Sequence, residues 1–305
     1  MLNYELTDIN GMKTVFTKPL QMSIVSSEDA PADSFSAVFS VTGSIPEIYS
    51  VCVRNGTDIL FLGFVDEQTE ETAANGVLLK IRARSSESLL LDNEAMPCRY
   101  CMPSLQLIYE RHLKPLGFKA FEGTKKSCIG ELVISKGMSE WQVLKNFCEK
   151  FYGTSPYISN DMIVHTGENR TADTLLINAN DSTIKIVRKL KRSAVISDIY
   201  ARTYRAGGYE MHFGNDFAAK HGIVRKRYVN TLESGKNSIL FTKKLLDESS
   251  GKYESYLIEK NGIIRCHVGD FIRMAGISEN VRVSEIHHVM TGKGEHTRIY
   301  CEVMH

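Results

Sequence analysis

The most site-like motif in the sequence is a pair of cysteines spaced as Cys98-x-x-Cys101. Two thiolates at this spacing supply half of a tetrahedral zinc site, but the sequence has no second pair of this kind. Cys128 and His112 complete the set only if folding brings them close. The pair also lies between prolines, not at the start of a helix, which disfavours thioredoxin-like redox chemistry. We therefore expect two reduced thiols in a turn, with Cys98 and Cys101 as weak metal candidates and no cofactor.

Cysteine usage as a whole also indicates free thiols. The seven cysteines are an odd set, and most have apolar neighbours, as in Val51-Cys52-Val53, where cysteine behaves as a small core residue. The N-terminus has no basic segment followed by an apolar one. The longest apolar stretch, residues 59–65, is far below the roughly 20 residues of a membrane-spanning helix. We expect a soluble protein that is made in the cytoplasm and has no membrane partner.

Known catalytic motifs are missing from the sequence. There is no His-Glu-x-x-His, no Gly-x-Ser-x-Gly and no glycine-rich loop that ends in lysine. The acidic pair Glu70-Glu71 falls in a segment that looks like an exposed loop, where carboxylates are usually just hydrated. Trp141 and Phe151 could form a platform for a sugar, but their helical spacing favours a place in the core. We predict no catalytic residues and no enzymatic activity.

The charges are balanced overall but are locally uneven. Lysine and arginine number 37 against 36 aspartates and glutamates, so no global field attracts nucleic acid or an anionic membrane. The densest basic run lies at residues 185–192, and a shorter one at residues 225–227. The first run could line a channel through which DNA passes, because phosphates attract positive charge. Lysines on a solvated strand edge explain it equally simply, and we prefer that interpretation.

Hydrophobic periodicity predicts a β, α+β, β order along the chain. Residues 34–85 alternate with period two, and Asn55-Gly56 supplies a tight reversal, which favours a small barrel or sandwich. The period then changes to 3.6 and predicts helices over 105–116 and 139–151. The second helix opens with a capping box formed by Ser139 and Gln142. A hairpin over 157–165 completes this α+β part.

Strands return in the last third of the sequence. Residues 167–182 are polar and are predicted to be an irregular linker, and a helix is expected from Ser238 to Leu246, ending before Gly251. A second β domain is predicted from four alternating segments together with a strand over 194–204. The four segments are 256–264, 270–274, 281–288 and 297–304. The hairpin over 61–83 and that over 280–303 have similar spacing, which fits either an internal duplication or the general likeness of antiparallel hairpins.

Several short motifs occur in an order that is similar to a known family. They are Ala83-Arg84-Ser85, Leu91-Asp92, Ala95-Met96-Pro97, Leu116-Gly117-Phe118, the segment Trp141 to Tyr152, Asp216 to Gly222, and Val268-Gly269-Asp270-Phe271-Ile272. Together they resemble the baseplate hub proteins of contractile phages, of the Mu-like and PBSX-like late control kind. His221 departs from the pattern, because an aromatic residue is usual there.

The resemblance implies an α+β, mainly β fold with two tail-tube-like antiparallel β-barrel domains and a small α+β domain inserted between them. The first barrel would span 1–90, the insertion 91–166, and the second barrel 167–305, with a helical and loop segment at about 205–250. Three copies would offer six similar barrels, so a homotrimer could adapt a six-fold tail tube to a three-fold spike.

The same resemblance implies the partners and the location. The partners would be the tail tube protein, the central spike protein, neighbouring baseplate proteins and the tape measure protein, with DNA only passing through a channel. The location would be the tail of a virion or a tail-like particle that assembles in the bacterial cytoplasm. Two alternatives stay open. A tail-tip hydrolase of cell-wall glycan needs a cleft with two acidic residues, and a carbohydrate-binding module needs exposed aromatic residues on a strand face.

Overall fold

The computed structural model describes residues 2–28, 30–74, 76–167, 172–177, 183–202, 208–230, 238–274 and 281–303. It divides into two units, Met1–Thr171 with His287–His296, and Ala172–Ile286 with Thr297–His305. Strands account for 51% of the chain and helices for 18%, which confirms the predicted α+β, mainly β class. None of the helices described is both long enough and apolar enough to cross a membrane.

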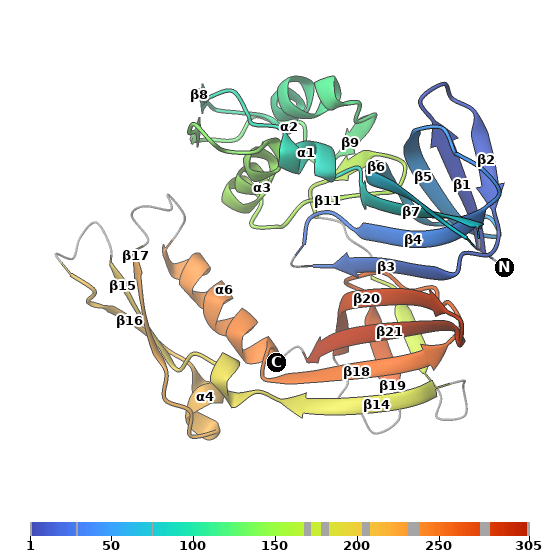
Figure 1. The fold of residues 1–305 in the computed structure, drawn as a ribbon. Helices are drawn as coiled ribbons and strands as arrows, with labels where there is room; N and C mark the ends of the chain where they lie inside the picture. The colour runs from blue at the N-terminus through green and yellow to red at the C-terminus, as the bar shows by residue number, and fades with distance from the viewer. Residues whose placement is uncertain are drawn as a thin grey trace. The chain divides into compact units, whose positions relative to one another are not determined.

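The first unit is built on an antiparallel sheet of strands from its N-terminal half (Figure 1). The order of its strands is β3-β4-β7-β6-β5-β1-β2. The Asn55-Gly56 reversal lies between β5 and β6, with Gly56 at φ 63°. The strands are β1 (Leu2–Asp8), β2 (Lys13–Phe16), β3 (Gln21–Ser27), β4 (Ser34–Val41), β5 (Ile48–Asn55), β6 (Asp58–Ala73) and β7 (Gly76–Ser85). The four strands expected after residue 34 are confirmed, whereas β1, β2 and β3 were not anticipated.

Aromatic side chains hold this sheet in a strongly curved form. Tyr4 on β1 contacts Phe39 on β4 with ring centroids 5.7 Å apart, and Phe16 on β2 lies 4.7 Å from the same ring. In the strand order, β1 and β2 are separated from β4 by β5, β6 and β7. The sheet must therefore curl until β1 and β2 face β4, because only then can these rings meet. Strand alternation places the rings on the concave face, where burial excludes water.

The α+β part of the first unit has a core of its own. Its elements are α1 (Ser88–Asp92), β8 (Cys98–Cys101), α2 (Leu105–Ile108), β9 (Ala120–Glu122), β10 (Glu131–Ile134), α3 (Glu140–Phe151), β11 (Tyr157–Ile158) and β12 (Ile163–His165). The predicted capping box of α3 is confirmed, with Ser139 Oγ accepting from Gln142 N. Trp141 and Phe151 pack against the core, as their spacing predicted.

The helix predicted over 105–116 forms, but its winding changes along its length. After α2, a π-helical turn spans Tyr109–Leu113 and a 3-10 turn spans Lys114–Leu116. Gly117 ends the segment at φ 91°, a conformation that glycine adopts without strain. A π-turn rotates the side chains that follow it relative to a regular helix, so it alters which residues face inward.

The second unit contains a six-stranded sheet in the order β14-β18-β21-β20-β19-β13. The strands are β13 (Thr174–Ile177), β14 (Thr183–Leu190), β18 (Glu254–Asn261), β19 (Phe271–Met274), β20 (Val281–Thr291) and β21 (Gly294–Val303). The prediction of an irregular linker over 167–182 was wrong at Thr174–Ile177, because β13 pairs there in parallel with β19. Residues 168–171 and 178–182 of that linker lie outside the described residues.

The Gly269-Asp270 motif builds the turn that brings β13 and β19 together. Gly269 adopts φ 94°, and the buried carboxylate of Asp270 accepts hydrogen bonds from the backbone N–H of His267 and of Asp173, at 2.7 and 3.2 Å. The second bond reaches the residue just before β13. The motif therefore has a structural role, which is to fix two strands that are distant in sequence.

A smaller sheet with strand order β16-β15-β17 forms the other part of the second unit (Figure 1). It comprises β15 (Asp198–Arg202), β16 (Met211–Gly214) and β17 (Lys226–Asn230), with α4 (Asp216–Lys220) and α6 (Ser238–Gly251). Helix α6 forms as predicted but runs on to Gly251, while the side chain of Ser238 lies outside the described set. Helix α4 explains the Asp216 to Gly222 motif, since Asn215 caps it through Phe217 N at 3.0 Å.

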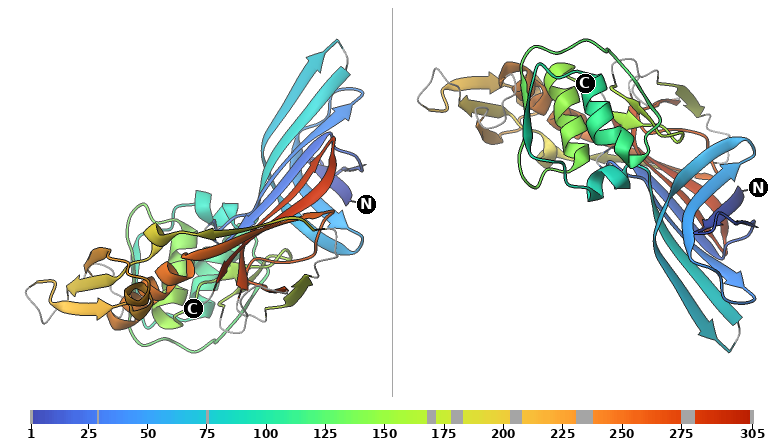
Figure 2. Two further views of the ribbon diagram at one scale, coloured as in Figure 1. Left: turned by 90° about the horizontal axis from the view of Figure 1, so that it is seen from below. Right: turned by 90° about the horizontal axis from the view of Figure 1, so that it is seen from above.

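The β6–β7 pair extends beyond the rest of its sheet as a two-stranded arm (Figure 2). The second half of β6 is almost entirely exposed, which matches this position. Glu70 and Glu71, predicted in a loop, lie in this part of β6 instead, because cross-strand pairing with β7 continues to Gly76.

At Gly63, at the base of the arm, β6 and β7 lie too close together for a side chain on β6. A Cβ atom at Gly63 would lie 2.2 Å from the backbone oxygen of Arg84, so Gly63→Ala forces β6 and β7 apart. We expect a loss of about 1–3 kcal/mol in the free energy of unfolding, measured by urea denaturation. Gly43→Ala is the matched control, because nothing lies within 4 Å of its Cβ position. Equal stability of the two variants would contradict the prediction.

Candidate functional site

The cysteine pair occupies a strand and not the predicted turn. Cys98 begins β8 and Cys101 ends it, paired with Ile134 and Glu131 of β10. Residues three apart in a strand point to opposite faces. Accordingly, Cys98 packs against the core while Cys101 is exposed, with Sγ 3.9 Å from Glu131 Oε1. The strand therefore holds the thiols apart, and across the part of the chain described here no cluster of three or more metal-binding side chains occurs.

His112, the other metal candidate near this motif, has partners that sequence reasoning missed. It is 4% exposed, with Nδ1 2.6 Å from Glu140 Oε2 and Nε2 3.0 Å from the Tyr100 hydroxyl. The three residues come from the π-turn, the first position of α3 and β8. A histidine oriented by a carboxylate resembles a general base, but complete burial closes it to a substrate. The group therefore acts as a polar joint inside an apolar core.

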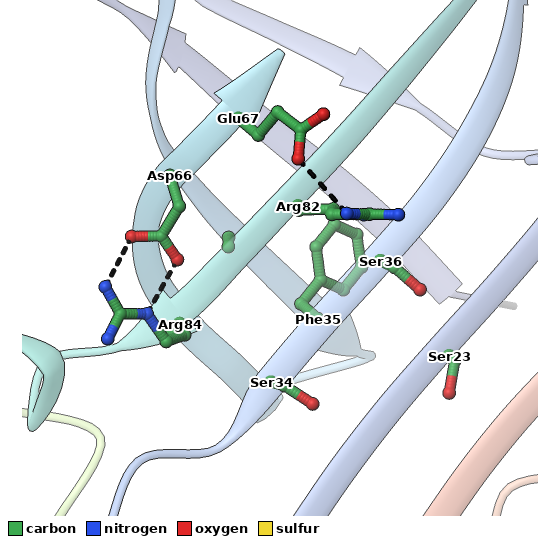
Figure 3. A pocket seen from close by; sticks show the side chains of 9 residues that line it. Ser23, Ser34, Phe35, Ser36, Asp66, Glu67, Arg82 and Arg84 are labelled. Atoms are coloured by element: carbon green, nitrogen blue, oxygen red, sulfur yellow. Dashed lines mark hydrogen bonds and ion pairs between the residues drawn. The ribbon is translucent and has the colours of Figure 1, made fainter. Parts of the chain in front are cut away.

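Arg84 forms ion pairs with two carboxylates of the first unit. Its guanidinium donates from Nε and Nη2 to Asp66, at 2.8 Å each, and from Nη1 and Nη2 to Asp92, at 3.1 and 2.7 Å (Figure 3 shows the Asp66 pair). Asp66 lies on β6 and Asp92 ends α1. The Arg84 hydrogen bonds hold the pKa of Asp92 below its usual range. This clamp ties the α+β part to the sheet, and Arg84 and Asp92 both belong to the motifs quoted for the family resemblance.

An open hollow of about 320 Å³, lined mostly by residues with polar side chains, lies at the clamp (Figure 3). Arg82 Nη1 lies 3.2 Å from Glu67 Oε2, so both carboxylates at this place are already paired with arginines. Paired carboxylates of this kind serve poorly as a general acid and base, which does not favour glycan hydrolysis here. The lining residues are Ser23, Ser34, Phe35, Ser36, Asp66, Glu67, Arg82, Ala83 and Arg84.

The acidic pair on the arm is also committed to structural contacts. Glu70 Oε1 accepts from Ile45 N at 2.8 Å and its carboxylate also accepts from the Ser44 hydroxyl. Glu71 forms an ion pair with Lys80 of β7, which lowers the pKa of Glu71. Adjacent strand residues point to opposite faces, so the two carboxylates do not converge on one point.

The basic run at 185–192 lies mainly on β14, which stands at one end of the strand order in the second unit. Arg188 pairs with Glu254 of β18 at 2.8 Å, whereas Ile186 and Leu190 on the same strand are exposed. Lysine is common on an edge strand of a sheet, so the position of β14 favours the interpretation of this run as a solvated strand edge. The role of this run at a DNA channel stays a prediction.

The fold of the chain is similar to the folds of solved tail proteins, although its sequence matches no protein-family model and no curated protein. The whole chain, rather than one part of it, is similar to solved tail proteins. The predicted resemblance to tail and baseplate hub proteins is therefore confirmed at the level of fold.

Three solved structures illustrate the likeness. A tail protein from Neisseria meningitidis has a TM-score of 0.77 at 16% identity, covering 99% of this chain and 96% of that one. The 43 kDa tail protein of prophage MuSo2 from Shewanella oneidensis has a TM-score of 0.81 at 13% identity, covering 99% and 98%. An Escherichia coli component of the type VI secretion system, described as similar to T4 bacteriophage tail proteins, has a TM-score of 0.59 at 7% identity, covering 94% and 74%.

The clamp predicts unequal roles for two neighbouring arginines. Arg84→Met removes two bidentate pairs and should lower the free energy of unfolding by roughly 1–2 kcal/mol. Arg82→Met is the matched control, because Arg82 is more exposed and makes a single contact with Glu67, so its loss should cost under about 0.5 kcal/mol. Thermal denaturation at low salt measures both. An Arg82 variant as unstable as the Arg84 variant would refute the clamp.

The surroundings of Glu87, directly before α1, predict that the stability of the fold depends on pH. It is half-buried and accepts a 2.6 Å hydrogen bond from the Ser85 hydroxyl, and burial raises the pKa of Glu87 to about 7. A raised carboxyl pKa favours the protonated form in the folded state. The contribution of Glu87 to the free energy of unfolding is therefore greatest below the pKa of about 4.5 that this carboxyl has in the unfolded chain. That contribution is lost as the pH rises towards 7.

Glu87→Gln should remove the loss of stability that Glu87 causes as the pH rises. Relative to the wild type, the variant should gain roughly 2 kcal/mol at pH 8 and little at pH 4, as measured by chemical denaturation across the pH range. Glu110→Gln, at an exposed position, is the control and should show no such trend. A pH-independent difference for Glu87→Gln would contradict the assignment.

Proposed function

We propose that this chain is the structural hub subunit of a contractile phage tail or of a related tail-like particle. The observation that carries the proposal is the near full-length likeness to phage tail proteins, which covers 99% of this chain in two of the comparisons. That likeness supports a structural role in a tail. The hub position and the non-enzymatic character are the parts that we add, and fold alone is an associational argument for them.

The hub proposal also assigns three parts to the chain. The first curved domain spans 1–90, the α+β insertion 91–166, and the second β domain 167–305. The curled sheet of the first unit and the six-stranded sheet of the second give one chain two β domains that could alternate around an axis. Three copies would then present six such domains, which suits an adaptor between a six-fold tube and a three-fold spike.

Strands at the ends of the two sheets support association between copies. Val15 on β2 is 57% exposed, and Ile186 and Leu190 on β14 are also exposed. Both strands stand at an end of the strand order within their own unit. Exposed apolar residues on such strands favour pairing with another chain. We infer that the homotrimer uses these strands, with the tail tube protein, central spike protein, neighbouring baseplate proteins and tape measure protein as further partners in the tail.

The proposed trimer is tested by the mass of the purified chain in solution. Light scattering after size-exclusion chromatography should give three times the mass of one chain. Val15→Asp should shift the population towards monomer, because a charge on a packed strand is costly to bury. Ile129→Asp, at an exposed apolar residue just before β10, is the control and should remain trimeric. A stable monomer that binds neither tube nor spike protein would refute the hub function.

A further inference from the structure

A serine, a histidine and a glutamate meet at the small sheet that β11, β12 and β9 form in the first unit. Glu122 ends β9, His165 ends β12, and Ser159 lies in the turn directly after β11. The Ser159 hydroxyl lies 3.2 Å from Nε2 of His165, and Nδ1 of His165 lies 3.1 Å from Glu122 Oε2. One imidazole therefore connects a hydroxyl group to a carboxylate through its two nitrogens.

Strand pairing fixes this arrangement. His165 is in register with Glu122 in the parallel pair of β12 and β9, and it is opposite Tyr157 in the antiparallel pair of β11 and β12. The rings of Tyr157 and His165 stack with centroids 4.6 Å apart and an interplanar angle of 4°, which restricts the plane of the imidazole. Ser159 N donates to Ile163 O at 3.0 Å and closes the turn, so the hydroxyl group is held beside the ring.

The roles of the two ring nitrogens follow from their neighbours. A carboxylate beside Nδ1 favours the tautomer that carries its proton on Nδ1. Nε2 then presents a lone pair to the Ser159 hydroxyl and accepts its proton, as the general base of an activated serine does. In contrast to the buried His112, the His165 side chain is 18% exposed and Ser159 is half-buried, so a small reagent can reach the pair.

Asp161 competes for the same hydroxyl group. The Ser159 hydroxyl also donates to Asp161 Oδ1, and it lies 3.2 Å from Ile163 O. An imidazole is a stronger base than a carboxylate or a backbone carbonyl. In a reaction at the Ser159 oxygen the proton therefore passes to His165, while Asp161 helps to hold the hydroxyl group in the turn.

The local charge selects the kind of electrophile that Ser159 meets. The carboxylates of Glu122 and Asp161 flank the hydroxyl and imidazole groups. In the part of the chain that the structure describes, neither carboxylate forms an ion pair with lysine or arginine. Phosphoryl donors carry negative charge that cations normally neutralise, so two carboxylates disfavour them. A neutral acyl ester meets no such repulsion.

We propose that Ser159 is a site of covalent acylation, with His165 as the general base and Glu122 as the residue that positions the imidazole. Ser159 Oγ attacks the carbonyl carbon of a neutral activated ester while its proton passes to His165 Nε2. The bond from that carbon to the leaving oxygen then breaks, and the proton on Nε2 neutralises the departing oxygen. The transfer modifies the chain itself and stands apart from the hub function, because it depends on the β11-β12-β9 sheet alone.

The test uses the full chain and p-nitrophenyl acetate, a small neutral ester. Peptide mass spectrometry after timed incubation should show the acetyl group forming on Ser159 about a hundredfold faster than on Ser44, because general base catalysis contributes on the order of 10²–10⁴-fold. Ser44 is the matched control within the same molecule, since it is an exposed serine whose hydroxyl donates to the carboxylate of Glu70 in place of an imidazole.

Two variants identify the base. His165→Ala should slow the acetylation of Ser159 about a hundredfold, and added imidazole should restore part of the rate. Asp161→Asn should leave the rate with p-nitrophenyl acetate nearly unchanged. With acetyl phosphate, an anionic donor, Asp161→Asn should raise the rate, because one of the two carboxylates is removed. Circular dichroism confirms that each variant is folded.

The tautomer of His165 tests the role of Glu122. Nitrogen chemical shifts of the imidazole distinguish a proton on Nδ1 from one on Nε2. Glu122→Ala should lower the fraction with the proton on Nδ1 and should slow the acetylation of Ser159. Slower acetylation with an unchanged tautomer would contradict the positioning role.

Three outcomes would overturn the acylation site itself. The first is a Ser159 that reacts no faster than Ser44. The second is a folded His165→Ala variant that keeps the wild-type rate or that imidazole does not restore. The third is an Asp161→Asn variant that reacts as slowly as His165→Ala, because the carboxylate and not the imidazole would then be the base. A rate with acetyl phosphate that Asp161→Asn does not raise would overturn the selection of neutral esters.

Discussion

Burial of one face of a strongly curved sheet is the constraint on which the first unit depends. Tyr4, Phe35, Phe39 and Phe61 are nearly inaccessible to water, and each contributes on the order of 2–3 kcal/mol through burial. Rings on strands far apart in the sheet can contact one another only when the sheet curls. The curvature of the sheet therefore follows from the hydrophobic burial of these side chains. The convex face is then free to carry the Arg84 clamp and the charged arm of β6 and β7.

Polar joints position the rest of the molecule on this apolar frame. Arg84 joins β7, β6 and the end of α1, while His112 joins three elements inside the α+β part. Asp270 plays a comparable part in the second unit by fixing the turn before β19. Each joint uses a charged or polar side chain with its hydrogen bonds satisfied, which makes burial or half-burial tolerable. The short motifs that resembled tail hub proteins thus describe places where elements are fastened.

Part of the fold and little of the candidate sites could be predicted. Alternation identified the strands between 34 and 85, and Ser139 with Gln142 identified the start of α3, because both signals are local. Strands β1 to β3 and β13 were missed, since β13 exists through parallel pairing with β19 almost a hundred residues later. The cysteine pair was expected in a turn, but pairing with β10 extended it into a strand.

The sequence by itself determined the class of elements, the apolar surroundings of most of the cysteines and the order β, α+β, β, because periodicity and caps act over a few residues. Only the tertiary structure decided which distant side chains meet, such as Arg84 with Asp92, His112 with Glu140, and Tyr200 with Tyr228. Those meetings depend on strand register and on where a helix changes its winding. Both are set by packing over the whole unit, and no short spacing in the chain records them.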